Sequence, residues 1–254
     1  MTDRLYQMNP QQRFTSRAED YAKYRPSYPS EAIDMVLEGL GELSDLIAAD
    51  IGAGTGISSR LLAQRGVKVI AIEPNSAMRQ VATSHPLVEF KDGDAENTKL
   101  EGNSVDLITC FQSFHWFNPE PTLIEFARIL KPGGKIALIW NDRDIDGDDE
   151  FTQQHDRIIT KASNNSPIHS RLDGKSDLYI NSLFSVVEHY LFPYQQAFTT
   201  DSLIGLAMSA SYMPKNGKES QQLVKNLTDL HQKYCDRGSL VYLHYHTSVY
   251  LVSL

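Results

Sequence analysis

The sequence predicts an α/β protein built on a mostly parallel sheet whose two faces are covered by helices. Three observations carry this prediction. Over the first 140 residues, segments typical of strands and of helices alternate about five times. The strand segments are short, continuous apolar runs, which is the pattern of parallel strands buried on both faces. A glycine-rich turn near residue 50 joins the first strand to a helix, and ligands of such sheets bind at the carboxyl ends of the strands.

Short apolar runs and helix breakers place the elements of the first 140 residues. Residues 16–24 form a short helix that Arg25-Pro26 ends, because a residue before proline is disfavoured in the helical region. Ser30 is a candidate N-cap of a helix over 30–40. Pro132-Gly133-Gly134 stops the chain before the last strand of this part. The other elements, in order, are strand 46–51, helix 57–64, strand 67–72, helix 75–84, strand 88–91, strand 105–111, helix 119–130 and strand 135–140.

The pattern changes after residue 140. Residues 141–150 form an acidic loop, residues 151–180 are polar and helical, and residues 186–192 form a strand. Helices follow at 200–209 and 219–235, and residues 240–254 are rich in β-formers. Two late strands with no crossover between them suit an antiparallel edge of the sheet. Because no repeat or low-complexity linker divides the chain, we expect a single domain over 1–254.

Composition narrows the class of partner. The chain has 24 basic and 32 acidic residues, a net charge of −8, whereas nucleic acid and anionic lipid both attract a basic surface. Cys110 and Cys235 are the two cysteines of the sequence and suggest no disulfide framework. No apolar run approaches the length of a membrane span, and the first residues lack an apolar signal core. We therefore expect a soluble, cytoplasmic protein that acts on a small molecule, not on nucleic acid or a membrane.

The turn near residue 50 is the most informative motif. Asp50 ends a strand and is followed by three alternate glycines, Gly52, Gly54 and Gly56. A dinucleotide fingerprint needs its third glycine at position 57, which is Ile57. A carboxylate beside the loop is an awkward neighbour for a pyrophosphate and suits a ligand with a positive charge. Glu73 ends the next strand, where a carboxylate can accept hydrogen bonds from both ribose hydroxyls.

These motifs resemble the seven-strand class I S-adenosylmethionine-dependent methyltransferases over about residues 45–140. The string D-x-G-x-G-x-G at 50–56, the acid after strand two, GDAE at 93–96 and LKPGG at 130–134 follow the family order. YAKYRPSYP at 21–29 and FQSFHWF at 111–117 resemble the small-molecule subgroup that includes trans-aconitate-type methyltransferases. The resemblance implies a Rossmann-like, doubly wound sheet with an antiparallel edge strand. It also implies an N-terminal lid with helices at 1–40, a cofactor-binding core at 45–140 and a variable acceptor-side region at 141–254.

The resemblance also assigns roles in binding S-adenosylmethionine. Asp50 and the glycines Gly52, Gly54 and Gly56 would hold the methionine portion, and Glu73 would bind the ribose. The adenine would lie against Pro74 or Asn75, with Asp94 bonding its amino group and Ala95 supplying backbone. Phe111 and Gln112 would flank the cofactor. Arg25 is a candidate for the methionine carboxylate, although an arginine at a helix end can equally be a surface residue.

Two residues are candidates for the chemistry. His115 follows the strand 105–111 and is either a general base or a hydrogen-bonded wall of the pocket. Arg143 follows the strand 135–140 and either pairs with an anionic acceptor or is the partner of Asp142 or Asp144. We favour a small anionic or polar acceptor, a carboxylate foremost, because a carboxylate is already nucleophilic and needs no base. Tyr212 and Lys215, in a loop between late helices, are candidates to close over the site.

No metal site is expected. Residues 142–147 imitate the start of a calcium loop, but position twelve would be Gln153 instead of a glutamate. His244 and His246 share one face of a strand without a third ligand. Three alternatives to a small-molecule methyltransferase stay open: a nucleic-acid or protein methyltransferase on the same fold, a cofactor-binding protein without catalysis, and a nicotinamide enzyme. The chain is expected to be a monomer or a homodimer.

Overall fold

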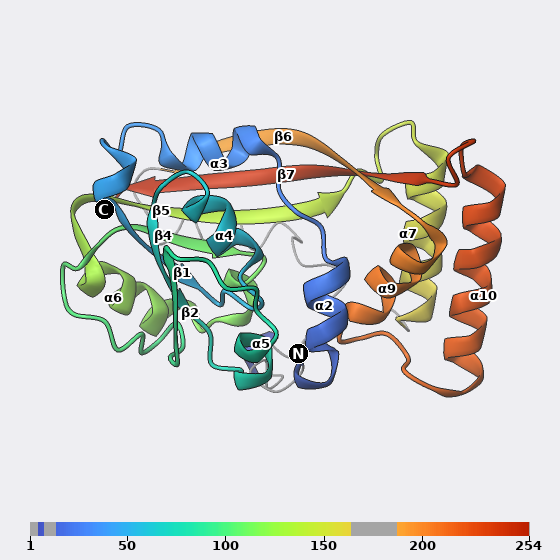
Figure 1. Ribbon diagram of the computed structural model, residues 1–254, viewed down its shortest axis with the longest axis horizontal. Coiled ribbons are helices and arrows are strands. Elements are labelled where there is room, and N and C mark those ends of the chain that lie inside the picture. The colour runs from blue at the N-terminus through green and yellow to red at the C-terminus, as the bar shows by residue number, and fades with distance from the viewer. Residues whose placement is uncertain (1–4, 8–13, 164–186, 254) are drawn as a thin grey trace.

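A seven-stranded sheet organises the computed structural model, which describes residues 5–7, 14–163 and 187–253. The strand order is β3-β2-β1-β4-β5-β7-β6. Strands β1 to β5 pair in parallel, whereas β7 is antiparallel to both β5 and the edge strand β6 (Figure 1). The strands are β1 (Ile47–Ile51), β2 (Lys68–Ile72), β3 (Val88–Lys91), β4 (Val105–Phe111), β5 (Leu130–Arg143), β6 (Val187–Phe198) and β7 (Val241–Ser253).

Helices cover both faces of the parallel part of the sheet. Successive residues of a strand point to opposite faces, so Leu107 packs with α3 and α4 while Ile108 packs with α6. The predicted α/β class, the doubly wound sheet and the antiparallel edge pairing are confirmed. The helices are α2 (Ala18–Tyr24), α3 (Ser30–Leu37), α4 (Ile57–Ala63), α5 (Ser76–Gln80), α6 (Pro119–Ile129), α7 (Glu150–Ala162), α9 (Thr200–Ser209) and α10 (Gly217–Tyr234).

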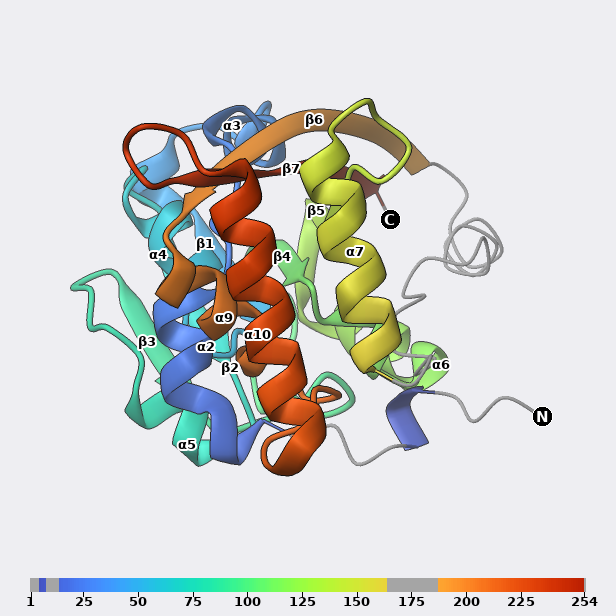
Figure 2. The same cartoon turned by 90° about the vertical axis from the view of Figure 1, so that its right-hand side faces the viewer.

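A second packed region lies at the other end of the long strands. Helices α7, α9 and α10 form a separate hydrophobic cluster with the ends of β6 and β7, around buried Phe198 and Leu243. Figure 2 shows these three helices in front of the sheet. Among the described residues, no helix combines the length and the apolar character that crossing a membrane requires.

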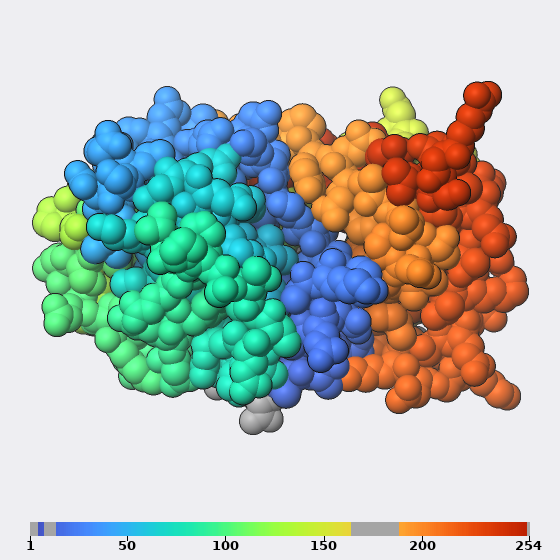
Figure 3. Space-filling view, viewed as in Figure 1, coloured from blue at the N-terminus to red at the C-terminus, as the bar shows by residue number. Residues whose placement is uncertain are grey.

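The N-terminal segment fills the space between these two regions. Helix α2 lies between α5 on one side and α9 on the other (Figure 3). The Arg17 guanidinium donates to the carbonyl oxygens of Met208 and Met213, the latter at 2.6 Å. The Tyr24 ring lies so close to Gly205 that a Cβ there would approach it to 2.3 Å. The segment is thereby fixed over the carboxyl ends of the strands.

Several element boundaries differ from the sequence-based expectation. Strand β5 begins at Leu130, so Pro132-Gly133-Gly134 does not precede the strand. It lies where the register shifts between the pairs Val105–Leu130 and Leu107–Lys135. Strand β6 runs to Phe198 and includes Pro193. An edge strand tolerates a proline, because the missing backbone N–H can fall on the side without a neighbouring strand. Helix α5 is shorter than predicted. The short 3₁₀ helix η4 (Phe114–Trp116) was not predicted, and residues 164–180 of the predicted helix lie outside the described residues.

Candidate active site

Two adjoining cavities open at the carboxyl ends of the parallel strands. The smaller cavity, of about 480 Å³, lies beside β2, the loop after β3, and η4. The larger cavity, of about 610 Å³, lies between the glycine loop, the end of β5, α7 and α9. Tyr21, Gly52 and Gln112 line both cavities, so the two chambers meet at these residues. A third hollow of about 20 Å³, lined in part by His115 and Tyr212, adjoins the same junction.

The glycine loop brings its backbone close to the neighbouring elements. Gly52, Gly54 and Gly56 all have positive φ, a conformation that other residues rarely adopt. A Cβ on Gly52 would lie 2.7 Å from the Cβ of Ser113, and one on Gly56 would lie 2.7 Å from the Phe90 ring. Gly52 lines both cavities and Gly54 lines the smaller one. Gly56 lines neither, and its role is to let α4 pack against β3.

Asp50 lies at the end of β1, directly before the glycine loop. Its side chain is fully buried and lines neither cavity. The carboxylate accepts hydrogen bonds from Ser58 Oγ at 2.7 Å, Ser59 Oγ at 2.6 Å and Thr109 Oγ1 at 3.0 Å. Burial raises the pKa of Asp50, and these three hydroxyl bonds oppose the shift. Asp50 therefore fixes the first turn of α4 and the loop before it, and direct contact with a ligand is not part of this geometry.

Glu73 faces the smaller cavity from the end of β2. Its Oε2 accepts the Gly54 N–H and its Oε1 accepts the Asn75 N–H, both at 2.8 Å. Burial raises the pKa of Glu73, while these two backbone bonds and the charge of Arg79 lower it. A carboxylate offers about four lone-pair positions, and the two backbone bonds leave acceptor capacity on both oxygens. The side chain is thus held rigidly with capacity for a pair of hydroxyl groups.

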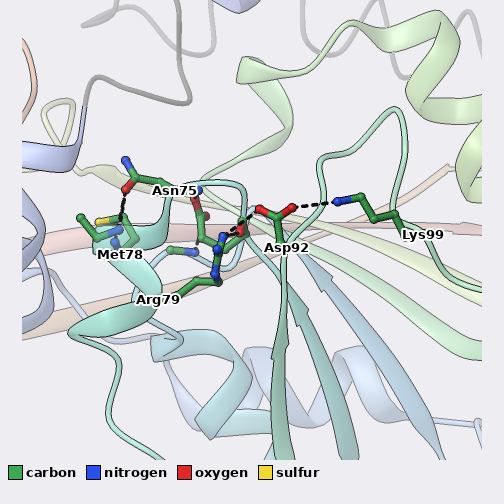
Figure 4. Close-up of polar contacts among 8 residues, drawn as sticks. Asn75, Met78, Arg79, Asp92 and Lys99 are labelled. Carbon is green, nitrogen blue, oxygen red and sulfur yellow. Dashed lines mark hydrogen bonds and ion pairs between the residues drawn. The ribbon is translucent and has the colours of Figure 1, made fainter.

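A polar network braces the wall beside Glu73 (Figure 4). Asn75 caps α5, because its Oδ1 accepts the N–H groups of Ala77 and Met78. Arg79 donates to the carbonyl of Glu73 and lies 3.2 Å from Asp92, which in turn is 2.7 Å from Lys99 Nζ. These contacts join β2, α5 and the end of β3.

The other predicted cofactor residues divide between the two cavities. Pro74, Asp94 and Ala95 line the smaller one, and Asp94 Oδ1 also accepts the Asn97 N–H at 2.9 Å. Phe111 lines the larger one and Gln112 lines both. Sequence reasoning did not single out several further residues of the smaller cavity, because their positions carry no motif of their own: Phe14, Met78, Ser113 and, for cofactor contact, Tyr21.

Gln112 carries a strained backbone at the junction of the cavities. Its φ of +53° lies in the left-handed region, which is uncommon for a residue with a side chain. The backbone N–H donates to Ile139 O at 2.9 Å and the side-chain Nε2 donates to Asn141 O at 2.7 Å. These two hydrogen bonds to β5 stabilise the strained conformation of Gln112. Strained backbone of this kind is common at functional sites.

Arg25 lies at the larger cavity and not at the smaller one. Its guanidinium lies 4.8 Å from the centre of the Tyr21 ring, an arrangement that favours a cation. Among the described residues, neither its Nε nor the Oγ1 of nearby buried Thr55 has a hydrogen-bond partner. Thr55 was not predicted, because it reads as a spacer between two glycines. Together they place two unused polar groups beside the glycine loop.

His115 is not poised as a general base. Its Nδ1 accepts the indole N–H of Trp140 at 3.2 Å. An indole nitrogen can only donate, so Nδ1 carries no proton and the neutral ring bears its proton on Nε2. The residue lines the small third hollow and neither large cavity. Of the two predicted alternatives, this geometry favours the hydrogen-bonded wall.

Arg143 lines the larger cavity, and one of its partners is an aspartate that the sequence patterns did not mark. The guanidinium bonds to Asp156 of α7, with Nε and Nη2 at 2.9 and 2.8 Å from Oδ1. Helix α7 packs over the end of β7 and brings Asp156 to β5. The same cavity is lined by His155 and Tyr245, which the sequence patterns did not mark. Tyr212 also lines it, whereas Lys215 bonds to Ser16.

Comparison with known proteins agrees with this site. Residues 49–138 match the family model of a methyltransferase domain. An uncharacterised methyltransferase of Mycobacterium tuberculosis is 32% identical over 200 residues, which are 78% of this chain and 76% of the relative. An uncharacterised methyltransferase-like protein of Schizosaccharomyces pombe is 30% identical over 214 residues, 83% of this chain and 82% of the relative.

A solved structure supports the fold. A protein of Anabaena variabilis, named as a methyltransferase of an antibiotic biosynthesis pathway, superposes with a TM-score of 0.63 at 23% identity. The match covers 92% of this chain and all of that one. The glycine loop, the carboxylate after β2 and the two joined cavities are thus found in a chain whose relatives are methyltransferases. The chain belongs to the class I S-adenosylmethionine-dependent methyltransferases.

Proposed function

We propose that this enzyme transfers the methyl group of S-adenosylmethionine to a small polar or anionic metabolite, with O-methylation of a carboxylate as the favoured reaction. The observation that carries the proposal is the pair of joined cavities, one with a rigid carboxylate and one with a cation, that meet at Gly52 and Gln112. The chain's place in the small-molecule subgroup remains part of this proposal. It is supported by the FQSFHWF segment at 111–117.

The residues present fit the cofactor. In the smaller cavity, the Glu73 carboxylate has acceptor capacity for two ribose hydroxyls, and Asp94 with Ala95 borders the space for a flat base. Beside the glycine loop, Arg25 Nε and Thr55 Oγ1 are buried polar atoms without a partner among the described residues. A guanidinium and a hydroxyl suit a carboxylate. We infer that these two groups hold the amino-acid end of the cofactor.

The larger cavity is the place for the acceptor. When bound, the cofactor supplies an activated methyl group, so the protein's main task is to position the nucleophile. The hydrogen bond from Trp140 to Nδ1 of His115 supports a reaction that needs no general base. A carboxylate acceptor is ionised at neutral pH and needs no deprotonation. Its negative charge would be stabilised by Arg143, which lines the same cavity.

The alternatives that act on macromolecules have less support. The net charge is −8, and RNA or DNA binding draws most of its affinity from basic residues. Helices α2, α7 and α9 border the larger cavity, and its volume of about 610 Å³ supports a small acceptor. A protein that binds the cofactor without turnover is separated from the proposed enzyme by the following experiment.

A methyl-transfer screen tests the proposal. The protein is incubated with S-adenosylmethionine labelled in its methyl group and with pools of small carboxylates, phenols or amines. We expect label in the carboxylate pool, and calorimetry should show binding of S-adenosylhomocysteine and none of NAD. Label confined to phenols or amines would exclude the carboxylate reaction. Cofactor binding without transfer to any pool would favour the non-catalytic alternative.

A further inference from the structure

The wall of the larger cavity formed by β5 and β7 has a polar composition that the cofactor does not explain. Arg143 of β5, Tyr245 of β7 and Tyr194 of β6 are direct register partners across three neighbouring strands. Directly opposed residues point to the same face of a sheet, so the three side chains lie in a row. Arg143 and Tyr245 line the cavity, while the Tyr194 ring packs 6.1 Å from that of Tyr245.

Tyr245 brings an unsatisfied hydroxyl to this row. The residue is 5% exposed, and its Oη has no hydrogen-bond partner in the part of the chain that the structure describes. Buried hydroxyl groups are nearly always bonded in native proteins, so an exception requires an explanation. The neighbouring Tyr194 does not provide the bond, and its own hydroxyl donates to Gln196 Oε1 at 3.1 Å.

The row sets a phenol beside a guanidinium, in a cavity that Asp142, Asp146 and Asp156 also line. Burial raises the pKa of Tyr245, although the positive charges of Arg143 and Arg25 lower it. The phenol therefore keeps its proton at neutral pH and acts as a donor. Asp156 orients the Arg143 guanidinium through two contacts, so the cation stands in a fixed position next to Tyr245. A phenol donor beside the Arg143 guanidinium matches an anionic oxygen.

We propose that Tyr245 and Arg143 form the acceptor subsite, in which the Tyr245 hydroxyl donates a hydrogen bond to an anionic oxygen, a carboxylate oxygen foremost, of the methyl acceptor. This inference rests on the proposed function, since it names the residues that select the acceptor. Tyr245 is a specificity-determining residue here, and Asp156 is a positioning residue that acts through Arg143. The unpaired hydroxyl is explained because its partner arrives with the acceptor.

Binding of acid and amide probes tests the subsite without requiring turnover. With S-adenosylhomocysteine present, calorimetry compares succinate with succinamide and benzoate with benzamide. We expect the wild type to prefer the acids and Tyr245→Phe to weaken acid binding about 10-fold or more, the scale of a hydrogen bond to a charged group. Amide binding and S-adenosylhomocysteine binding should not change. Tyr242→Phe is the matched control, because it makes the same change on the same strand, where the hydroxyl contacts the exposed Asp236.

The outcomes separate this inference from the proposed reaction. A wild type without acid preference, or a Tyr245→Phe variant that binds acids like the wild type, would overturn the subsite. A drop in the melting temperature of Tyr245→Phe would also overturn it, because the hydroxyl would then have a partner within the fold. Once an acceptor is identified, the variant should raise its KM more than it changes kcat. If Tyr245→Phe abolishes the acid preference but the wild type labels no pool, the subsite stands and the proposed reaction fails.

Discussion

Single residues in the two cavities have distinct tasks, and Glu73 has the most testable one. Glu73→Ala should weaken binding of S-adenosylhomocysteine by about 1.5–3 kcal/mol, because charge-assisted hydrogen bonds to the ribose are lost. Calorimetry measures the change. Glu89→Ala on the neighbouring strand β3 is the control, since Glu89 is exposed and pairs only weakly with Lys91 at 3.6 Å. An unchanged dissociation constant in Glu73→Ala would place the ribose elsewhere.

The pH dependence of cofactor binding follows from the same residue. Burial raises the pKa of Glu73 above the ordinary glutamate value of 4.5. The ionised form is the better acceptor of two hydroxyl bonds, so affinity should be full above the raised pKa and fall as the pH drops through it. Calorimetry between pH 8 and pH 5 would detect a decline that begins above the ordinary glutamate range. The same series with Glu73→Gln should be flat.

His115 distinguishes a positioning role from base catalysis. Because Trp140 bonds its Nδ1, His115→Ala should lower kcat less than about 10-fold, whereas removal of a general base costs about 10²–10⁴-fold. The rate is measured with the acceptor that the labelling screen identifies. His189→Ala on β6 serves as control, because that exposed histidine stacks on Tyr250 away from the cavities. A 10²-fold or larger loss of kcat in His115→Ala but not in His189→Ala would show that His115 acts as a general base.

At the scale of elements, Asp50 joins the sheet to a helix. Its carboxylate ties Ser58 and Ser59 of α4 to Thr109 of β4. Asp50→Ala leaves three buried hydroxyl groups without their acceptor and should reduce the free energy of unfolding by about 1–3 kcal/mol or more. Denaturant titration measures this loss. If the variant were as stable as the wild type but bound the cofactor more weakly, Asp50 would instead contact the cofactor directly.

The N-terminal segment is the element that we expect to respond to the cofactor. Tyr21 lines both cavities and Arg25 the larger one, so ligand contacts should hold α2 in place. Trypsin cleavage within residues 14–28 should therefore slow when S-adenosylhomocysteine is added. Cleavage at the exposed Lys218, at the start of α10, provides the internal reference. Equal protection of both regions, or of neither, would argue against a lid.

For the molecule as a whole, charge limits the choice of partner. With a net charge of −8, the protein should not bind labelled RNA or DNA oligonucleotides at micromolar concentration in 150 mM salt, because nonspecific affinity comes from neutralising phosphates. Fluorescence anisotropy measures this directly. Binding that weakens steeply with added salt would reveal a local basic surface and reopen the nucleic-acid alternative.

The sequence by itself determined the parallel half of the sheet and the cofactor side of the site. The predicted bounds of β3 and β4 are the observed ones. Gly52, Gly54 and Glu73 lie at strand ends, where a parallel sheet gathers them at one edge. Each of these features can be recognised from a short stretch of sequence. Because the carboxyl ends of parallel strands meet at one edge of the sheet, the fold class alone brings them together.

Only the tertiary structure decided which groups are available for chemistry. Asp50 bonds to Thr109, His115 to Trp140 and Arg143 to Asp156, and each pair is brought together by the packing of separate elements. Tyr245 reads as one tyrosine among several in a β-rich segment, yet its register opposite Arg143 directs it to the cavity. Pairing between distant segments is set by the whole packed core. Such pairing produces no sequence pattern at the residue itself. The residues of the acceptor side could therefore be identified only from the folded structure.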